Sequence, residues 1–548
     1  MTVESHKTNS METAHQLHYC CPHLMLRWKR NKNMHVLAIL RAQLHVSRCS
    51  RSLELAQESL PLALSHTKST THLLSIYLIN EQNRSRSIRT LIGYRHLTVA
   101  AMAPLHKAKV LEQCRISPYP GSTARPSIPL TFFDLVFFRF HPVQRLLFYE
   151  SPQSKSHFLH SELPKLKHSL ALTLHHFYPL AGSLTRSCGG QKPEILCSDD
   201  DFVWLNAAVS EGDFYELSGS HAQDVRRFHS LVPSLHSSGD RQAVLAIQAT
   251  IFPNAGVVVG TTLHHAVADG STYASFMKTW ASIHRFGDQA ADLAGRLPFY
   301  DRSVIKDSKG LEGIFLTDLQ LLADDQSLEA WDLDGRSDIV RATFTFRRDQ
   351  LDGLRQQVAS KTSAQCSPYA AACGFVWAGL VHARGGTSKK KEHFGFVTGC
   401  RARLDPPIPS NYFGNCLGIC CVEAKQSELI GCDGPLIAAD AIWKVIKSLE
   451  EGAFKDAENW IRNVYKYASV GALTVAGSPK LGMYEVDFGW GRPRKVEVIS
   501  IERTGALSLA ESREEKGGIE VGLALPSHEM EEFVSFFVNG LSGLSLPR

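Results

Sequence analysis

This sequence lacks the features that mark several protein classes. None of its apolar runs approaches the roughly 20 residues that cross a bilayer, so we expect no membrane-embedded segment. It contains no H-E-x-x-H and no paired C-x-x-C spacing, and because a zinc site needs three or four ligands, we expect no metal. Glycine pairs such as Gly189 and Gly190 lack the strand–helix spacing of a dinucleotide fingerprint, so neither NAD nor FAD is implied.

The cysteines do not form a recognisable disulfide framework. There are 13 of them, an odd number, and they are scattered, which favours reduced thiols in a cytosolic compartment. Hydrophobic residues make up 44% of the chain and charged residues 21%, as in soluble globular proteins. Because 548 residues exceed what a single core supports, we expect two domains of about 200 residues each.

Acidic residues are scarce in the N-terminal segment. Residues 1–101 hold 13 Lys and Arg but only five Glu and no Asp, so the net charge of +5 is a property of this segment. Three interpretations stay open: an organelle transit peptide, a basic arm for nucleic acid or membrane, and translated sequence upstream of the true start. The charges are diffuse rather than interleaved with aromatic residues, which disfavours nucleic acid.

The segment HHAVADG at 264–270 places His265 four residues before Asp269. An apolar, β-branched run at 255–263 predicts a buried strand before it, and apolar residues at helical spacing in 271–283 predict a helix after it. A neutral imidazole at such a junction can take a proton from an alcohol, a role worth roughly 10²–10⁴ in rate. We therefore interpret His265 as a candidate general base that Asp269 orients; a core histidine or a pair of metal ligands are the alternatives.

A second segment, DFGWG at 487–491, lies more than two hundred residues downstream. Its two glycines permit a tight turn, and a further strand is expected at 496–500. Such a turn can aim the indole N–H of Trp490, a donor without acceptor capacity, at a developing oxyanion. The alternative is a structural turn in which Trp490 packs and Asp487 pairs with an arginine.

With these two motifs, the chain resembles the plant BAHD acyl-CoA-dependent acyltransferases over nearly everything after Met102. The further segments that carry the resemblance are LTFFDLVFFRF (130–140), HFYPLAG (176–182), IFPN (251–254), DRSVIKD (301–307), CRARLDPPIPSNYFGNC (400–416) and ESREEKGGIEVGL (511–523). Within them, YFGNC at 412–416 resembles the branch that acylates anthocyanins, flavonoid glucosides and phenolic glucosides with malonyl or hydroxycinnamoyl donors.

The resemblance implies an α/β fold of two similar mixed-sheet domains, of the chloramphenicol-acetyltransferase type, with a through-going active-site channel. His265 would lie in mid-channel and deprotonate a sugar hydroxyl, which attacks acyl-CoA directly, without an acyl-enzyme. Acyl-CoA is then a co-substrate and no bound cofactor is expected. Malonyl is the favoured donor, although its carboxylate needs a channel cation, for which Arg401 and Arg403 are candidates. The alternative is a non-catalytic homologue that binds acyl-CoA or a phenolic ligand.

The resemblance also assigns roles to individual residues. Asp269 moves to structural support, together with Gly270, because in this family it bonds an arginine, here Arg401 or Arg403. The other expected site residues are Asp487 and Trp490 in catalysis, Ser367, Phe488 and Gly489 at CoA, and Phe133 and Phe137 at the acceptor. Ser367 is included because it precedes Pro368 as a helix N-cap, and a helix N-terminus can meet a phosphate; a core helix with an ordinary cap is the alternative. The aromatic pair has an ordinary core as its alternative.

The domain boundaries follow from these assignments. We expect a basic extension at 1–101, disordered or a misassigned start, because the residues after Met102 look like an ordinary family N-terminus. An N-terminal acyltransferase domain then spans 102–299, an acidic crossover linker 300–338, and a C-terminal domain 339–548. We expect a cytoplasmic monomer that binds acyl-CoA and a phenolic glucoside, and neither nucleic acid nor membrane.

Overall fold

The computed structural model describes residues 105–121, 126–185, 192–287, 295–322, 338–362, 365–385, 390–452, 454–542 and 544. The expected extension at 1–101 lies outside them. None of the helices in these ranges combines the length and hydropathy that crossing a bilayer requires.

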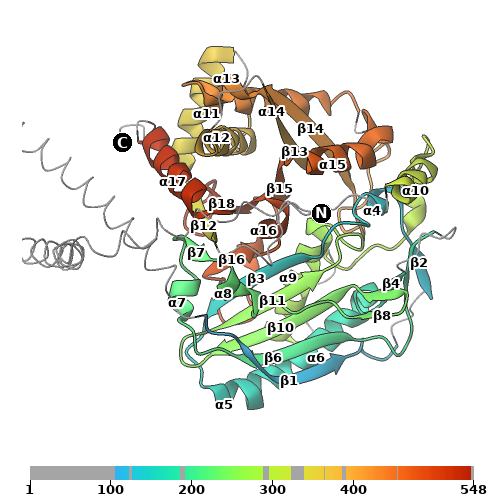
Figure 1. The fold of residues 1–548 in the computed structure, drawn as a ribbon. Coiled ribbons are helices and arrows are strands. Elements are labelled where there is room, and N and C mark those ends of the chain that lie inside the picture. Colours follow the sequence, from blue (N-terminus) through green and yellow to red (C-terminus); the bar gives the residue numbers. More distant parts are fainter. Residues whose placement is uncertain are drawn as a thin grey trace, which may run out of the picture. The chain divides into compact units, whose positions relative to one another are not determined.

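The first large sheet has six strands in the order β1-β6-β10-β11-β3-β16 (Figure 1). Its strands are β1 (Lys109–Ile116), β3 (Val143–Glu150), β6 (Val203–Val209), β10 (Leu245–Phe252), β11 (Gly256–Leu263) and β16 (Lys495–Val498). All residues of β10 and β11 are buried, which confirms the buried strand predicted at 255–263 and explains its continuous Val and Thr content. This strand delivers the chain to His265.

Helices cover both faces of the first sheet. Leu166 and Phe276 belong to the core on the Leu147 face, whereas Phe214 and Phe228 belong to the cluster on the Leu146 face. The helices of the N-terminal half are α4 (Phe132–Leu135), α5 (Lys155–His157), α6 (Leu163–His176), α7 (Phe214–Leu217), α8 (Arg226–His229) and α9 (Gly270–Phe286). The indole N–H of Trp280 on α9 donates to the hydroxyl of Ser169 on α6 at 3.1 Å, so these two helices are joined within the core. The helix predicted at 271–283 is therefore confirmed as α9.

The second large sheet has seven strands in the order β14-β13-β15-β17-β18-β12-β7. They are β7 (Gln223–Asp224), β12 (Ile339–Phe346), β13 (Lys391–Gly399), β14 (Leu417–Lys425), β15 (Leu473–Gly477), β17 (Leu507–Glu511) and β18 (Ile519–Pro526). Its helices are α11 (Arg348–Thr362), α12 (Pro368–Ala383), α13 (Gln426–Ile430), α14 (Gly434–Ser448), α15 (Trp460–Ser469), α16 (Ile501–Thr504) and α17 (Ser527–Leu541). Figure 1 shows α11, α12 and α14 together beside this sheet.

The two large sheets exchange strands. β16 comes from the C-terminal half but pairs with β3, with Val498 opposite Arg145. β7 comes from the N-terminal half but pairs with β12, with Asp224 opposite Val340. Dividing the chain at 299 and 339, as expected from the sequence, assigns each of these strands to the domain opposite its sheet. Local strand pattern identifies a strand but not the edge that accepts its hydrogen bonds.

Smaller elements complete the described chain. A five-stranded sheet contains β2 (Ser127–Pro129), β5 (Glu194–Leu196), β4 (Ser183–Thr185), β9 (Arg241–Ala243) and β8 (Ser237–Ser238). Single turns are the π-turn η1 (Phe158–Glu162) and the 3-10 turns η2 (Tyr178–Leu180), η3 (Arg302–Val304), η4 (Ala457–Asn459) and η5 (Met483–Glu485).

The described part of the expected linker is ordered. It forms α10 (Leu311–Leu321), whose Phe315 is buried and lies 6.4 Å, ring centroid to centroid, from both Phe132 and Trp460. Phe132 belongs to α4 and Trp460 to α15. The linker therefore starts as a packed helix that touches elements from both halves of the chain.

Candidate functional site

His265 lies in the turn between β11 and α9. The turn is tied at its start, where the backbone N–H of His264 donates to the carbonyl of Val244 at 2.9 Å. It is also tied from the C-terminal half, since the amide of Asn415 donates to the carbonyl oxygen of His265 at 2.9 Å. Residues from both halves of the chain thus fix the backbone that carries the imidazole.

The imidazole of His265 is half-buried and stacked. The Phe137 ring lies 4.1 Å from it, centroid to centroid, with 13° between the planes. Within the described chain, the buried Nδ1 atom has no hydrogen-bond partner. Burial lowers the pKa of His265, and the positive charge of Arg145 lowers it further, against the opposing effects of a backbone hydrogen bond and Asp269. The ring is therefore neutral at pH 7, which is the form a general base requires.

Asp269 supports this turn, and its hydrogen bonds go to groups other than the imidazole. Its Oδ1 accepts from the backbone N–H groups of Ser271 at 3.1 Å and Thr272 at 3.0 Å, which makes it the N-cap of α9. Arg401 donates to both carboxylate oxygens, at 2.5 Å and 3.1 Å. Of the two expected arginines, the structure pairs Asp269 with Arg401, whereas Arg403 donates to the carbonyl of Gly399.

Gly270 fills a position with little room for a side chain. A Cβ atom there would lie 3.0 Å from Cδ1 of Leu481, tighter than ordinary van der Waals contact. The first residue of α9 is therefore packed directly against the segment that precedes η5. This contact agrees with the supporting role expected for Gly270.

A buried network behind His265 was not assigned from the sequence. Asp134, which is fully buried, accepts from the backbone N–H of Asn415 at 2.8 Å and its side-chain amide at 3.0 Å. It also accepts from Arg302 at 3.0 Å and from the Thr131 hydroxyl at 2.8 Å. Asn415 in turn donates to the His265 carbonyl oxygen. Asp134 and Arg302 therefore position the turn indirectly, through Asn415. The sequence feature that could have revealed this network is the single acidic residue inside the apolar run LTFFDL, since carboxylates are rarely buried unless they are paired.

The DFGWG turn is organised by Asp487. One carboxylate oxygen accepts from the backbone N–H groups of Gly489 at 2.7 Å and Gly491 at 2.8 Å, and the other accepts from Arg285. Gly489 and Gly491 have φ of +96° and +86°, a region that favours glycine. This is the structural arrangement that the sequence left open as an alternative. A catalytic role for Asp487 stays a prediction.

Trp490 does not face His265. Its indole N–H donates to Glu162 on η1 at 3.1 Å. The turn contacts the last turn of α9, through Arg285 and through His284, whose Nδ1 lies 2.7 Å from the Phe488 carbonyl oxygen. Because α9 has 17 residues and rises by 1.5 Å per residue, about 25 Å separates its two ends. The expectation that the Trp490 indole N–H serves as an oxyanion donor beside His265 is therefore wrong.

Two further expected site residues, Phe488 and Phe133, lie within the packed core. Phe488 is 1% exposed, with its ring centroid 4.8 Å from that of Trp280, so its side chain is part of the core and not an exposed CoA contact. Phe133 is also fully buried, 4.4 Å from Phe132. Its ring is therefore core instead of the expected acceptor surface, because neighbouring aromatics exclude any ligand. Phe137, by contrast, does reach the candidate site.

Ser367 caps α12, and its hydroxyl accepts from the Ala370 backbone N–H at 3.2 Å. Contact of this helix with CoA stays a prediction. Contact of Gly489 with CoA likewise stays a prediction.

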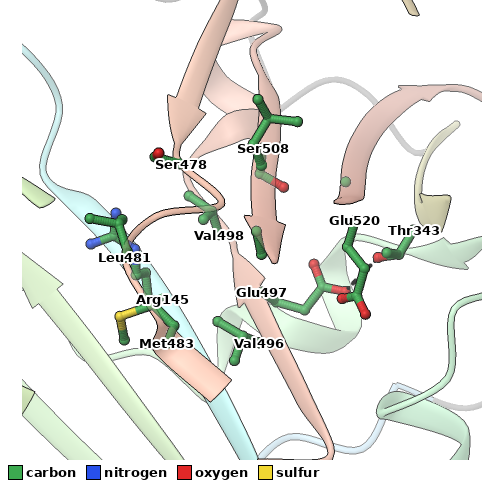
Figure 2. Close-up of a pocket in the computed structure, with 14 residues that line it drawn as sticks. Arg145, Thr343, Ser478, Leu481, Met483, Val496, Glu497, Val498, Ser508 and Glu520 are labelled. Atoms are coloured by element: carbon green, nitrogen blue, oxygen red, sulfur yellow. Dashed lines mark hydrogen bonds between the residues drawn. The ribbon is translucent and has the colours of Figure 1, made fainter. Parts of the chain in front are cut away.

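Two cavities lie near the elements that hold His265. One lies between the two large sheets, and its lining includes Arg145, Val496, Val498, Thr343, Ser508 and Glu520 (Figure 2). The other is lined by Ser271 and Ser275 of α9 together with Asn411 and Tyr412. In the described ranges, no three His, Cys, Asp or Glu side chains cluster in a way that would hold a metal.

Comparison with known proteins identifies the family. The profile of the Transferase family matches residues 107–538. The chain belongs to this family. Phenolic glucoside malonyltransferase 2 of Arabidopsis thaliana is 38% identical over 448 residues, 79% of this chain and 99% of that protein. A coumaroyl-CoA:anthocyanidin 3-O-glucoside-6''-O-coumaroyltransferase 1 of the same organism is 34% identical over 466 residues, 80% of this chain and 99% of that protein.

A solved structure agrees with the fold of this BAHD acyltransferase. The crystal structure of vinorine synthase matches with a TM-score of 0.59 and 21% identity, covering 80% of this chain and 98% of that one. The expected α/β fold with two mixed sheets is confirmed. The through-going channel stays a prediction.

Proposed function

We propose that this protein transfers an acyl group from acyl-CoA to a sugar hydroxyl of a flavonoid, anthocyanin or phenolic glucoside, with malonyl as the favoured donor. The observation that carries the proposal is the half-buried imidazole of His265, held in the turn between β11 and α9, where burial lowers its pKa. Two relatives, a phenolic glucoside malonyltransferase and an anthocyanidin glucoside coumaroyltransferase, supply the two donor classes.

The chemistry assigned to His265 is direct transfer. The imidazole accepts the proton of the sugar hydroxyl while its oxygen attacks the thioester carbonyl. The tetrahedral intermediate then collapses, the carbon–sulfur bond breaks, and the imidazolium returns the proton to the departing thiolate. An ester and free CoA leave, and the base is neutral again.

The surrounding residues position the base. Asp269 and Arg401 hold the start of α9, and Asn415 holds the His265 carbonyl. Phe137 stacks on the imidazole, which limits its rotation to a narrow range. Such restraint supports the reaction because it keeps the base within hydrogen-bond reach of the hydroxyl.

The direct test is turnover by the purified protein. Malonyl-CoA and p-coumaroyl-CoA are each offered with a panel of phenolic and flavonoid glucosides, and thiol release is measured. His265→Ala should lower kcat by about 10²–10⁴. His393→Ala, which removes a histidine that lies on β13 beside Tyr467 and Glu423, is the matched control and should not.

The pH profile is a second readout for the base. Because burial lowers the pKa of His265 below its ordinary 6.5, activity should persist at pH 6.5 and fall only as acid protonates the ring. Full turnover by His265→Ala would refute the base assignment. Binding of donor and glucoside without any thiol release by the natural chain would instead indicate a non-catalytic homologue.

The oligomeric state and location belong to the same proposal. A monomer in the cytoplasm is the state we expect for an enzyme that draws on acyl-CoA. Light scattering of the purified protein and a fluorescent fusion in plant cells would measure the two properties.

A further inference from the structure

Arg145 is a buried cation without a protein counter-ion. It lies on β3 and is 6% exposed. Its guanidinium carbon is 4.6 Å from the centroid of the Tyr273 ring. Across the described residues, no hydrogen bond or ion pair engages this guanidinium. A cation–π contact alone compensates little of the cost of burying a charge.

The other buried cations of the described chain differ in this respect. All of them form ion pairs: Arg227 with Glu216, and Arg341 and Lys495 with Glu497. Buried charges are normally paired, because desolvation without a partner is costly. Arg145 therefore has the character of a residue whose counter-ion arrives with a ligand.

Arg145 lies among the elements that hold His265. Arg145 stands opposite Thr261 on β11, two residues before that strand ends. The Thr261 hydroxyl and the Tyr273 hydroxyl are 2.8 Å apart, so Arg145 is between the end of β11 and the first turns of α9. The positive charge of Arg145 is close enough to lower the pKa of His265.

The cavity between the two sheets reaches this cation. Figure 2 shows Arg145 beside Leu481 and Met483 on one side of the cavity, with Glu497 and Glu520 on the other. Both carboxylates already have donors. Glu497 accepts from Arg341 at 2.8 Å, and Glu520 accepts from the Tyr484 hydroxyl at 2.6 Å. The acids of the cavity are thus engaged, whereas its arginine is not.

The two cations expected from the sequence for a malonyl carboxylate differ from Arg145. Arg401 pairs with Asp269 and also donates to the carbonyl oxygens of Tyr412 and Gly414. Arg403 donates to the carbonyl of Gly399. The Arg401 guanidinium is therefore already paired, and that of Arg403 is exposed to solvent.

We propose that Arg145 binds the free carboxylate of a malonyl donor and so makes the protein selective for a dicarboxylic acyl group. The inference rests on the function proposed for His265. In malonyl-CoA a single methylene separates the carboxylate from the thioester carbonyl, so its cation must lie beside the base. A guanidinium can hold a carboxylate with two parallel N–H···O bonds, and a hydroxycinnamoyl group offers no such partner.

Donor preference tests this role. With one glucoside acceptor, kcat/KM is measured for malonyl-CoA and p-coumaroyl-CoA. Arg145→Gln should lower the value for malonyl-CoA roughly 10- to 100-fold, the range for a lost hydrogen bond to a charged group. The value for p-coumaroyl-CoA should change little. Arg145→Lys, which keeps the charge without the planar fork, should show a smaller loss with the same selectivity.

The matched control is Arg494→Gln. Arg494 also stacks on a tyrosine, Tyr215, but it is exposed and pairs with Glu150. This substitution should leave unchanged the ratio of kcat/KM for malonyl-CoA to kcat/KM for p-coumaroyl-CoA. An equal loss with both donors, or no change in the ratio, would overturn the carboxylate role.

A binding measurement separates this inference from the proposed function. In the His265→Ala background, calorimetry compares malonyl-CoA with CoA itself, without turnover. Arg145→Gln should weaken malonyl-CoA and leave CoA unaffected, and thermal melts confirm that each variant is folded. Equal affinities for malonyl-CoA with and without Arg145 would overturn the inference even if acyl transfer by the natural chain is demonstrated.

Discussion

One signature motif begins α9 and the other contacts its C-terminal turn, and both use the same chemistry at different depths. At the N-terminal end, Asp269 caps backbone N–H groups and pairs with Arg401, with side-chain exposures of 0% and 12%. At the C-terminal end, Asp487 also accepts from two backbone N–H groups and pairs with Arg285, with exposures of 22% and 44%. A similar residue pattern is therefore a buried anchor in one place and a partly solvated turn in the other.

The difference in burial separates what each pair contributes. Breaking a buried ion pair leaves an uncompensated charge and costs about 3–5 kcal/mol, whereas exposed pairs contribute about 0–1 kcal/mol. The helix joins the two motifs mechanically but keeps them about 25 Å apart. We therefore expect the first motif to control both folding and chemistry, and the second mainly the local turn.

The largest effect should come from Asp269→Asn. Its amide oxygen still caps α9, but Arg401 is left buried without a negative partner. Unfolding free energy should fall by about 3–5 kcal/mol, measured by urea denaturation.

A double-mutant cycle controls this result. Arg401→Gln should cost much less in the Asp269→Asn background than in the natural chain. Additive costs would contradict the pairing.

Asp487→Asn should have a smaller effect. The substituted amide oxygen can still accept from Gly489 and Gly491, so only the half-exposed charge pair with Arg285 is lost. The same denaturation experiment should show a loss of about 0–1 kcal/mol. A loss as large as that of Asp269→Asn would break the contrast between the two ends, and loss of kcat in a stable variant would assign Asp487 a catalytic part.

Trp490→Phe should affect stability but not the chemistry. The ring keeps its place beside Tyr149 and Phe488, while the hydrogen bond to Glu162 is lost. Because the acceptor is a carboxylate, stability should fall by about 1.5–3 kcal/mol, with kcat unchanged. A selective fall in kcat at full stability would show that the indole acts on the reaction after all.

Sequence patterns predicted the parts of this molecule that depend on local composition. The β-branched run of β11 and the apolar spacing of α9 place His265 in a strand-to-helix turn, as expected. The same patterns did not show that Phe133 and Phe488 are core residues, because an aromatic side chain in an apolar stretch suits a core or a pocket equally well.

Local sequence pattern could not predict the contacts between the two halves of the chain. Choosing Arg401 over Arg403, and finding that Asn415 holds the carbonyl of His265, both depend on residues more than 130 positions away. Their partners are set by how the chain crosses between sheets, including the transfer of β16 to the first sheet.

The amino-acid sequence by itself determined the class of fold, the family and the candidate base, because these follow from periodicity and from short motifs whose residues are neighbours in the chain. Only the tertiary structure decided which arginine is paired and which is left for a ligand. The sequence contains many arginines with similar neighbours, and the free energy of each depends on whether folding buries it beside a carboxylate or, like Arg145, without one.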